Sequence, residues 1–166
     1  MTKKTKTPAT AMVIGVTVAV ALAGIASYVA LNWAPLQSSA ESASTESDMI
    51  SLGSTVYAAQ CAACHGANLE GQPNWRARKA NGRLPAPPHD ETGHTWHHDD
   101  DTLFNLTKYG LSALVGQPVE TDMPAYDGVL TDAQIRASLA YIKSRWPEEI
   151  RKRQTEMSRR AAAERG

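Results

Sequence analysis

The pentapeptide Cys61-Ala62-Ala63-Cys64-His65 constrains this chain more than any other part of its sequence. The spacing C-x-x-C-H is typical of covalent attachment of a c-type haem, in which both thiols add to the porphyrin and the histidine binds the iron. We therefore predict one covalent haem c, attached at Cys61 and Cys64, with His65 as an axial ligand of the iron.

Three other interpretations fit this motif less well. A structural zinc site takes about four ligands, whereas Cys61 and Cys64 are the only cysteines in the chain. A redox-active dithiol belongs to a βαβ pattern, and the sequence does not alternate predicted strands with helices. A disulfide across so short a loop would remove little entropy from the unfolded chain. Haem attachment therefore remains the prediction.

An uncharged stretch runs from Ala11 to Leu31, well before the motif. As a helix its 21 residues would be about 30 Å long, which matches the hydrocarbon core of a bilayer. Three lysines precede it and the next basic residue is Arg76, so the charge bias places the N-terminus in the cytoplasm. We predict that residues 1–10 are a basic cytoplasmic end and that residues 11–33 are a single transmembrane anchor.

A cleaved signal peptide is the alternative for this segment. A basic start, an apolar core and small residues such as Ala21 and Ala23 also fit a signal sequence. The apolar stretch, however, is longer than the roughly 7 to 15 residues of a usual signal core. Both interpretations export the rest of the chain, which predicts a location at the bacterial cytoplasmic membrane with the haem domain in the periplasm.

Composition divides the remaining chain into three segments. Residues 34–48 are rich in Ser, Ala and Glu and are predicted to be a flexible linker, because they cannot bury enough apolar surface to become ordered. Residues 49–146 are predicted to form the haem domain. Residues 147–166 begin with Pro147 and two glutamates and become arginine-rich, as expected for a helix with a favourable dipole. We predict that this charged C-terminal helix is solvated, because it has few apolar residues.

Helix signals lie on both sides of the haem motif. Asp48 is a candidate N-cap for a helix that leads into the motif, and Asp101 for a short helix that Gly110 would end. The sequence Thr131-Asp132-Ala133-Gln134 is a capping box before a helix that should end at Trp146, ahead of a proline. The haem domain is therefore predicted to be all-α.

Three further features are Gly53-x-x-x-Tyr57 before the motif, Met123-Pro124 far behind it, and Leu139-Ala140-Tyr141-Ile142. Together with the motif they resemble class I bacterial cytochromes c over roughly residues 48–146. The resemblance implies a small fold of short helices around one haem, in which the first and last helices cross where the missing side chain of Gly53 admits Tyr141. It also implies an electron-transfer protein and not an enzyme.

Met123 is the candidate for the sixth iron ligand, because it lies in a loop that Pro124 stiffens. A thioether there would favour the ferrous state and raise the reduction potential; the alternative is a methionine that fills a gap in the core.

By the resemblance, the carbonyl group of Pro85 or of Pro87 accepts the free N–H of His65. We expect a membrane-tethered monohaem protein that carries single electrons between redox partners.

A second group of candidate ligands lies in the segment His94-Thr95-Trp96-His97-His98. If this segment were α-helical, its histidines would share one face and could bind copper or zinc. The alternatives are a polar loop, or a histidine from this group as a distal haem ligand. The corresponding rival functions are a haem enzyme or gas sensor with a labile sixth ligand, and an accessory copper-binding protein that uses His94, His97 and His98.

Charged and aromatic residues indicate which side chains could contact the haem and which kind of partner the domain could bind. Trp75 and Arg76 are candidates for holding a haem propionate. The range Glu41–Trp146 has 13 acidic and 8 basic residues, a net charge of −5, so a redox protein partner should present a basic face. The chain has no basic stripe interleaved with aromatic residues, which argues against nucleic-acid binding.

Overall fold

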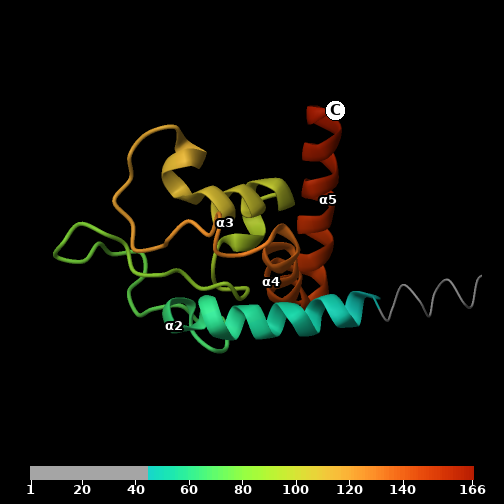
Figure 1. The fold of residues 1–166 in the computed structure, drawn as a ribbon, viewed down its shortest axis with the longest axis horizontal. Coiled ribbons are helices and arrows are strands. Elements are labelled where there is room, and N and C mark those ends of the chain that lie inside the picture. The colour runs from blue at the N-terminus through green and yellow to red at the C-terminus, as the bar shows by residue number, and fades with distance from the viewer. Residues whose placement is uncertain (1–44) are drawn as a thin grey trace, which may run out of the picture. The chain divides into compact units, whose positions relative to one another are not determined.

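The computed structural model describes residues 45–166, whose regular secondary structure is entirely helical (Figure 1). A helix over residues 45–60 leads into the short helix α2, and a long irregular segment follows. The remaining elements are the 3-10 helix η1 and three longer helices. In chain order the named elements are α2 (Ala62–His65), η1 (Thr95–His97), α3 (Asp100–Val115), α4 (Asp132–Ser144) and α5 (Glu148–Arg165). The all-α prediction is confirmed for these residues.

The predicted cytoplasmic end and the predicted anchor, residues 1–10 and 11–33, lie outside the described residues. Within residues 45–166, no helix is long and apolar enough to cross a membrane. Residues 45–48, predicted as the end of the linker, are helical, so Asp48 lies inside the helix and is not its N-cap. Tertiary packing explains the difference, because Met49 and Ile50 in the next turn line a groove together with residues of α4 and α5.

The helix over residues 45–60 crosses α4 at Gly53, as predicted. A Cβ atom on Gly53 would overlap the backbone carbonyl group of Ala137 and would lie 2.9 Å from Cβ of Tyr141. The Tyr141 ring then packs against Tyr57, with 5.4 Å between the ring centroids. The two helices can approach this closely only because residue 53 has no side chain.

Two groups of buried side chains form the core. One consists of Tyr57, Leu69, Ile142 and Trp146, and the other of Phe104, Tyr126 and Ile135. Leu139 of α4 packs against both groups. The core therefore joins the helix over residues 45–60, α3, α4 and the loops on either side of α3, and Cys61 and Ala62 of the haem motif pack against its first group.

The N-cap of α3 differs from the prediction. Asp99, not Asp101, is the N-cap, and its carboxylate accepts hydrogen bonds from the backbone N–H groups of Asp101 and Thr102. Gly110 has the non-helical backbone angles φ 81° and ψ 167°, and a second helical stretch follows it up to Val115, with Gly116 as the C-cap. The predicted helix therefore does end at Gly110, and the sequence did not predict the second helical stretch that continues α3 beyond this break.

The capping box of α4 is confirmed. The Thr131 hydroxyl accepts a hydrogen bond from the backbone N–H of Gln134, and the Gln134 side chain accepts one from the backbone N–H of Thr131. The helix ends at Ser144, before the predicted end at Trp146. Its last turn tightens there, since the N–H of Trp146 donates to the carbonyl group of Lys143, three residues back.

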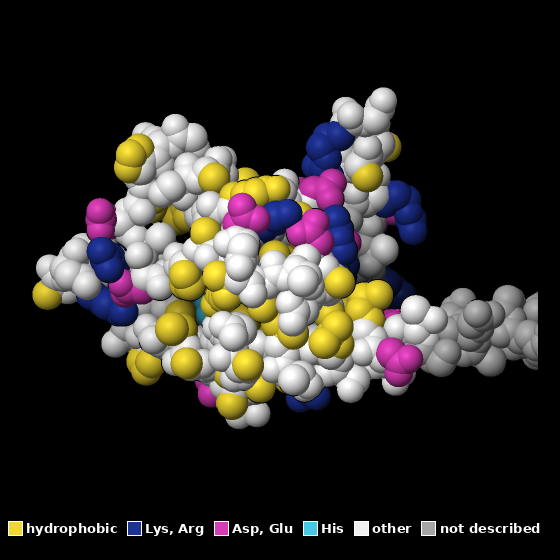
Figure 2. All heavy atoms as spheres, viewed as in Figure 1, with side chains coloured by type: hydrophobic (Ala, Val, Ile, Leu, Met, Phe, Trp, Pro, Cys, Tyr) yellow, Lys and Arg dark blue, Asp and Glu magenta, His cyan; other side chains and the backbone are white. Residues whose placement is uncertain are grey.

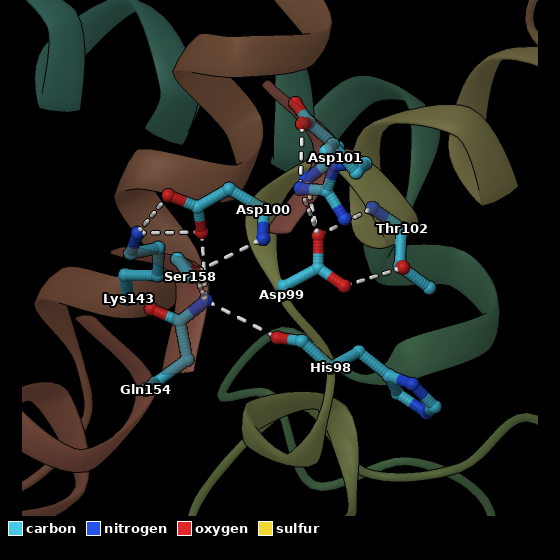
Figure 3. A network of polar contacts seen from close by, with 9 residues as sticks. His98, Asp99, Asp100, Asp101, Thr102, Lys143, Gln154 and Ser158 are labelled. Carbon is cyan, nitrogen blue, oxygen red and sulfur yellow. Dashed lines mark hydrogen bonds and ion pairs between the residues drawn. The ribbon is translucent and has the colours of Figure 1, made fainter. Parts of the chain in front are cut away.

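Composition predicted that the C-terminal helix α5 is solvated, but this holds for only part of its surface. On the face seen in Figure 2, acidic and basic side chains lie next to one another beside α5. Gln154, however, is fully buried, and its Nε2 donates to the carboxylate of Asp100 at 2.7 Å and to the carbonyl group of His98 at 3.2 Å (Figure 3). Arg165 reaches Asp99 at 3.0 Å and Asp101 at 2.8 Å. The helix docks on the start of α3 through polar contacts, which a count of apolar residues cannot reveal.

Asp100 should make this docking sensitive to acid. Burial alone raises the pKa of Asp100, but hydrogen bonds from Lys143 and Gln154 and the charge of Lys143 bring it below its ordinary value. A carboxyl group with a lowered pKa in the folded state stabilises the fold above its unfolded pKa of about 3.9, and this stabilisation is lost as the pH falls through the folded pKa. We expect stability to decrease below about pH 4 as α5 loses this contact.

The variant Asp100→Asn tests this expectation. At neutral pH it should lower the free energy of unfolding by about 1 kcal/mol, since solvent screens the half-exposed carboxylate, and it should flatten the pH dependence below about pH 4. Thermal unfolding of the holoprotein, followed by circular dichroism at several pH values, measures both effects. The matched control is Asp127→Asn, which changes an exposed carboxyl group elsewhere. Equal behaviour of the two variants would contradict a role for Asp100.

Candidate haem site

The helix α2 holds four of the five residues of the haem motif, and Cys61 precedes it as the N-cap. The His65 side chain is buried, and its Nδ1 lies 2.8 Å from the carbonyl oxygen of Pro87. A carbonyl oxygen only accepts, so Nδ1 must carry the proton and the lone pair of Nε2 is left free to bind a metal ion. Of the two prolines that the sequence left open, the structure selects Pro87.

The surroundings of His65 favour the neutral imidazole. Burial lowers the pKa of His65, while the hydrogen bond with Pro87 acts in the opposite direction. The turn that follows is held by Tyr57, whose hydroxyl group donates to the carbonyl group of Gly66 at 2.9 Å. Neutral imidazole is the form that binds iron, so these contacts prepare His65 as a ligand.

The two cysteines are free thiols at the start of the motif. Cys61 is half-buried and Cys64 is exposed. Burial, together with the neighbouring Cys64, raises the pKa of the Cys61 thiol to about 11. The structure therefore does not form the short disulfide considered above, and it leaves both sulfur atoms available for thioether bonds.

The loop that carries Met123 is fastened beside the motif by Tyr126. The Tyr126 hydroxyl group donates to the carbonyl group of Gln60 at 2.7 Å, directly before Cys61. Burial first, and then the nearby thiols of Cys61 and Cys64, raise the pKa of Tyr126. The half-buried Met123 lies three residues before this anchor, so the fold brings the predicted sixth ligand into the neighbourhood of the haem motif.

The break at Gly110 gives this loop a second point of attachment. The backbone N–H of Tyr126 donates to the carbonyl groups of Thr107 and Lys108, each at 3.1 Å, and Asp127 donates to Lys108 at 2.8 Å. These carbonyl groups lie in the turn that precedes the break in α3. Gly110, where the first helical part of α3 ends as predicted, thereby also helps to position the Met123 loop.

Ion pairs join the Met123 loop to the loop that follows the motif. Both loops extend to the same side of the molecule in Figure 1. Arg83 contacts Asp122 and Glu120, each at 2.7 Å, and Lys79 contacts Asp122 at 3.1 Å. Asp122 directly precedes Met123, so this ion-pair clamp of Lys79, Arg83, Glu120 and Asp122 restrains the loop at the residue next to the predicted ligand.

The variant Arg83→Gln should loosen this clamp. In the ferric holoprotein we expect the pH midpoint at which the sulfur-to-iron absorption band disappears to fall, by roughly a few tenths of a pH unit because exposed ion pairs contribute little. High salt should reduce the difference from the parent protein. A pH titration in the near infrared measures the midpoint. Arg78→Gln is the control on the same loop, and equal midpoints for the two variants would rule the clamp out.

The two candidates for propionate contacts lie together. The guanidinium group of Arg76 lies 4.0 Å above the ring of Trp75, and Trp75 stacks on His94 with 5.4 Å between the ring centroids. This arrangement is a stack of a cation and two aromatic rings. Contact between Trp75 or Arg76 and a propionate stays a prediction.

The predicted accessory metal site is not supported. His94, His97 and His98 do not lie on one α-helical face, because η1 is a short 3-10 turn and His98 follows it with an extended backbone. The His97 ring instead stacks on Trp96 with 3.7 Å between centroids. Within residues 45–166 no three His, Cys, Asp or Glu side chains form a group that could hold a metal ion.

His89 lies beside the motif, and the sequence alone did not indicate a role for it. The ring of His89 stacks on the ring of His65, with 3.9 Å between centroids and 20° between planes. Burial, with the nearby His65 and His94 adding to it, lowers the pKa of His89 well below its ordinary value. No spacing rule connects these two histidines, because the contact depends on the path of the irregular segment between them.

The donor set fits a covalent haem better than any other cofactor. Two free thiols and one histidine with a fixed tautomer lie within one short motif, and residues 45–166 hold no group of three His, Cys, Asp or Glu side chains that could bind a metal ion instead. The family model for cytochrome c matches residues 50–146. The chain belongs to the cytochrome c family.

A cytochrome c holds its haem covalently, and Cys61 and Cys64 fit the attachment motif in this chain. Membership of the family also makes the protein a haem-based electron-transfer protein. No curated protein and no solved structure gives a match to the chain. The matched range ends at residue 146, so the cytochrome c domain as the family defines it ends before α5.

Proposed function

We propose that this protein is a monohaem cytochrome c that carries single electrons between redox proteins, with His65 and Met123 as the axial ligands. The main support is the arrangement at the motif, where Pro87 fixes the tautomer of His65 and Tyr126 fastens the Met123 loop to Gln60. Bound haem would supply one-electron redox chemistry. The residues of the chain hold both ligands in place, which suits a carrier because little needs to move when the iron changes its oxidation state.

We further propose that the N-terminal segment tethers this domain to the bacterial cytoplasmic membrane, with the haem domain in the periplasm. The support is the uncharged stretch Ala11–Leu31, the three lysines before it and the lack of another basic residue before Arg76. Such a tether would raise the effective concentration of the domain near partners in the same membrane. The net charge of −5 over Glu41–Trp146 favours partners with a basic face.

The rival functions lack comparable support. A copper-binding protein would need the three-histidine site that the structure does not form. A haem enzyme or gas sensor would need an open or labile sixth position, whereas the Met123 loop is fastened at Gln60, Thr107 and Lys108. The carrier function therefore fits the geometry best.

An absorption spectrum tests the electron-carrier function. The full chain is expressed with a working haem-ligation apparatus, and the membrane and soluble fractions are purified. We expect a pigmented protein whose ferric form has the near-infrared sulfur-to-iron band and whose ferrous form does not bind carbon monoxide rapidly. A colourless protein would overturn the haem assignment, and rapid carbon monoxide binding without the near-infrared band would overturn the carrier.

Mass spectrometry of the same preparation tests the tether. An N-terminus that retains residues 11–33, in protein recovered from the membrane fraction, is the expected result. Cleavage near Ala23 together with recovery from the soluble fraction would contradict the anchor, and would leave the electron-carrier proposal to be decided by the spectrum.

A further inference from the structure

The contact between His89 and His65 lies outside the roles already assigned. The two imidazole rings are stacked at 3.9 Å, and His89 also lies near Tyr57, whose ring is edge-on at a centroid distance of 6.3 Å. His65 thus has one edge held by Pro87 and one face covered by His89. A stacked imidazole in contact with a ligand can restrain it without binding the iron.

Hydrogen bonds hold both the backbone and the side chain of His89 in place. Its backbone N–H donates to the carbonyl group of Leu69 at 2.7 Å, and its own carbonyl group accepts from Nε1 of Trp146 at 2.7 Å. Its Nδ1 shares a hydrogen bond of 2.7 Å with the hydroxyl group of Thr95. Leu69, Trp146 and Thr95 are all buried. The ring of His89 is therefore a fixed surface.

The two restraints on His65 act on different motions. The hydrogen bond with Pro87 holds Nδ1 near one carbonyl oxygen, but a hydrogen bond accepts a range of angles and so still permits some rotation of the ring about the Cβ–Cγ bond. A second ring stacked on its face blocks that turn, because the rings would collide. Together, the two contacts restrain the plane of the His65 imidazole more tightly than either alone.

We propose that His89 is a positioning residue that sets the plane of the His65 imidazole, and through it the rotational orientation of this ligand at the haem iron. This inference rests on the proposed function insofar as His65 is the proximal ligand. Outer contacts of this kind orient ligands and tune metal centres. The orientation of an axial imidazole determines how unpaired electron density is distributed over a ferric haem, so it is visible in the paramagnetic NMR spectrum.

The test compares the haem methyl resonances of ferric holoproteins. We expect His89→Ala to move these resonances by more than their linewidths, because the His65 ring can then turn. His89→Phe keeps a flat ring at this position and should return the resonances toward those of the parent. His97→Ala is the matched control, since His97 stacks on Trp96 and not on His65; its haem resonances should stay in place.

A second variant keeps the inference testable if His89→Ala does not fold. Thr95→Val preserves the shape of Thr95 but removes its hydrogen bond with His89, and should move the same resonances by a smaller amount. Unchanged haem methyl resonances in Thr95→Val, together with unchanged resonances in whichever of the His89 variants fold, would overturn the proposal. The Met123 methyl resonance of the ferrous parent protein tests the axial ligation separately, so failure of the proposed function can be told from failure of the role of His89.

Discussion

Replacing Met123 by alanine is expected to lower the reduction potential by a few tenths of a volt, within the roughly 0.8 V over which axial ligands set haem potentials. A thioether favours the ferrous state, and its loss leaves the sixth position to a weaker ligand. The near-infrared band of the ferric protein should disappear, and the ferrous protein should bind carbon monoxide. Potentiometric titration and absorption spectra measure these changes.

The control for this variant is Met49→Ala. Met49 lies exposed on the helix over residues 45–60, at the groove lined by α4 and α5, and its replacement should leave the potential unchanged. The covalent haem should be retained in both variants, because Cys61 and Cys64 are intact. If Met123→Ala kept the parent potential and stayed inert to carbon monoxide, another side chain would have to be the sixth ligand.

Replacing Gly53 by valine should destabilise the folded protein by about 3 kcal/mol or more, near the upper end of the cost of overpacking a core. Even the first atom of a side chain at residue 53 overlaps the carbonyl group of Ala137, and backbone cannot move aside as a flexible side chain can. The helix over residues 45–60 would have to shift away from α4, and the haem motif would move with it. Denaturant unfolding of the holoprotein measures the loss.

Ala58→Val is the matched control on the same helix. Ala58 is exposed, so the control carries the same β-branched penalty in a helix without the collision with α4. If Gly53→Val accumulates too little protein, Gly53→Ala replaces it, because one added carbon already meets Ala137. A Gly53 variant no less stable than Ala58→Val would show that the two helices are not pressed together at this point.

Several features could be predicted because their cause is local or is carried by a few residues. The haem attachment follows from the covalent chemistry of Cys61 and Cys64. The start of α4 follows from the hydrogen bonds that Thr131 and Gln134 make within one turn. The crossing at Gly53 was implied by the family resemblance, and its physical reason is that only glycine lets two backbones approach so closely.

The expectations from sequence that differ from the structure have a different cause. The solvated-helix prediction for α5 rested on composition, whereas Gln154 of α5 donates hydrogen bonds to His98 and Asp100, which precede it by 56 and 54 residues. The alternative of a metal site at His94, His97 and His98 required an α-helical turn, and the chain there forms η1 followed by an extended residue. Both differences came from residues whose conformation depends on their neighbours in space.

By itself, the sequence determined the cofactor, the all-helical class of the haem domain and the identity of the first ligand candidate, because these depend on bond-forming side chains and on short-range helix signals. Only the tertiary structure decided that Pro87 and not Pro85 holds His65, that His89 covers its ring, and that the Met123 loop is anchored at Gln60. These contacts join residues that are far apart in the chain, and no repeating sequence pattern indicates which of them will meet. They form only when the core brings the irregular loops together.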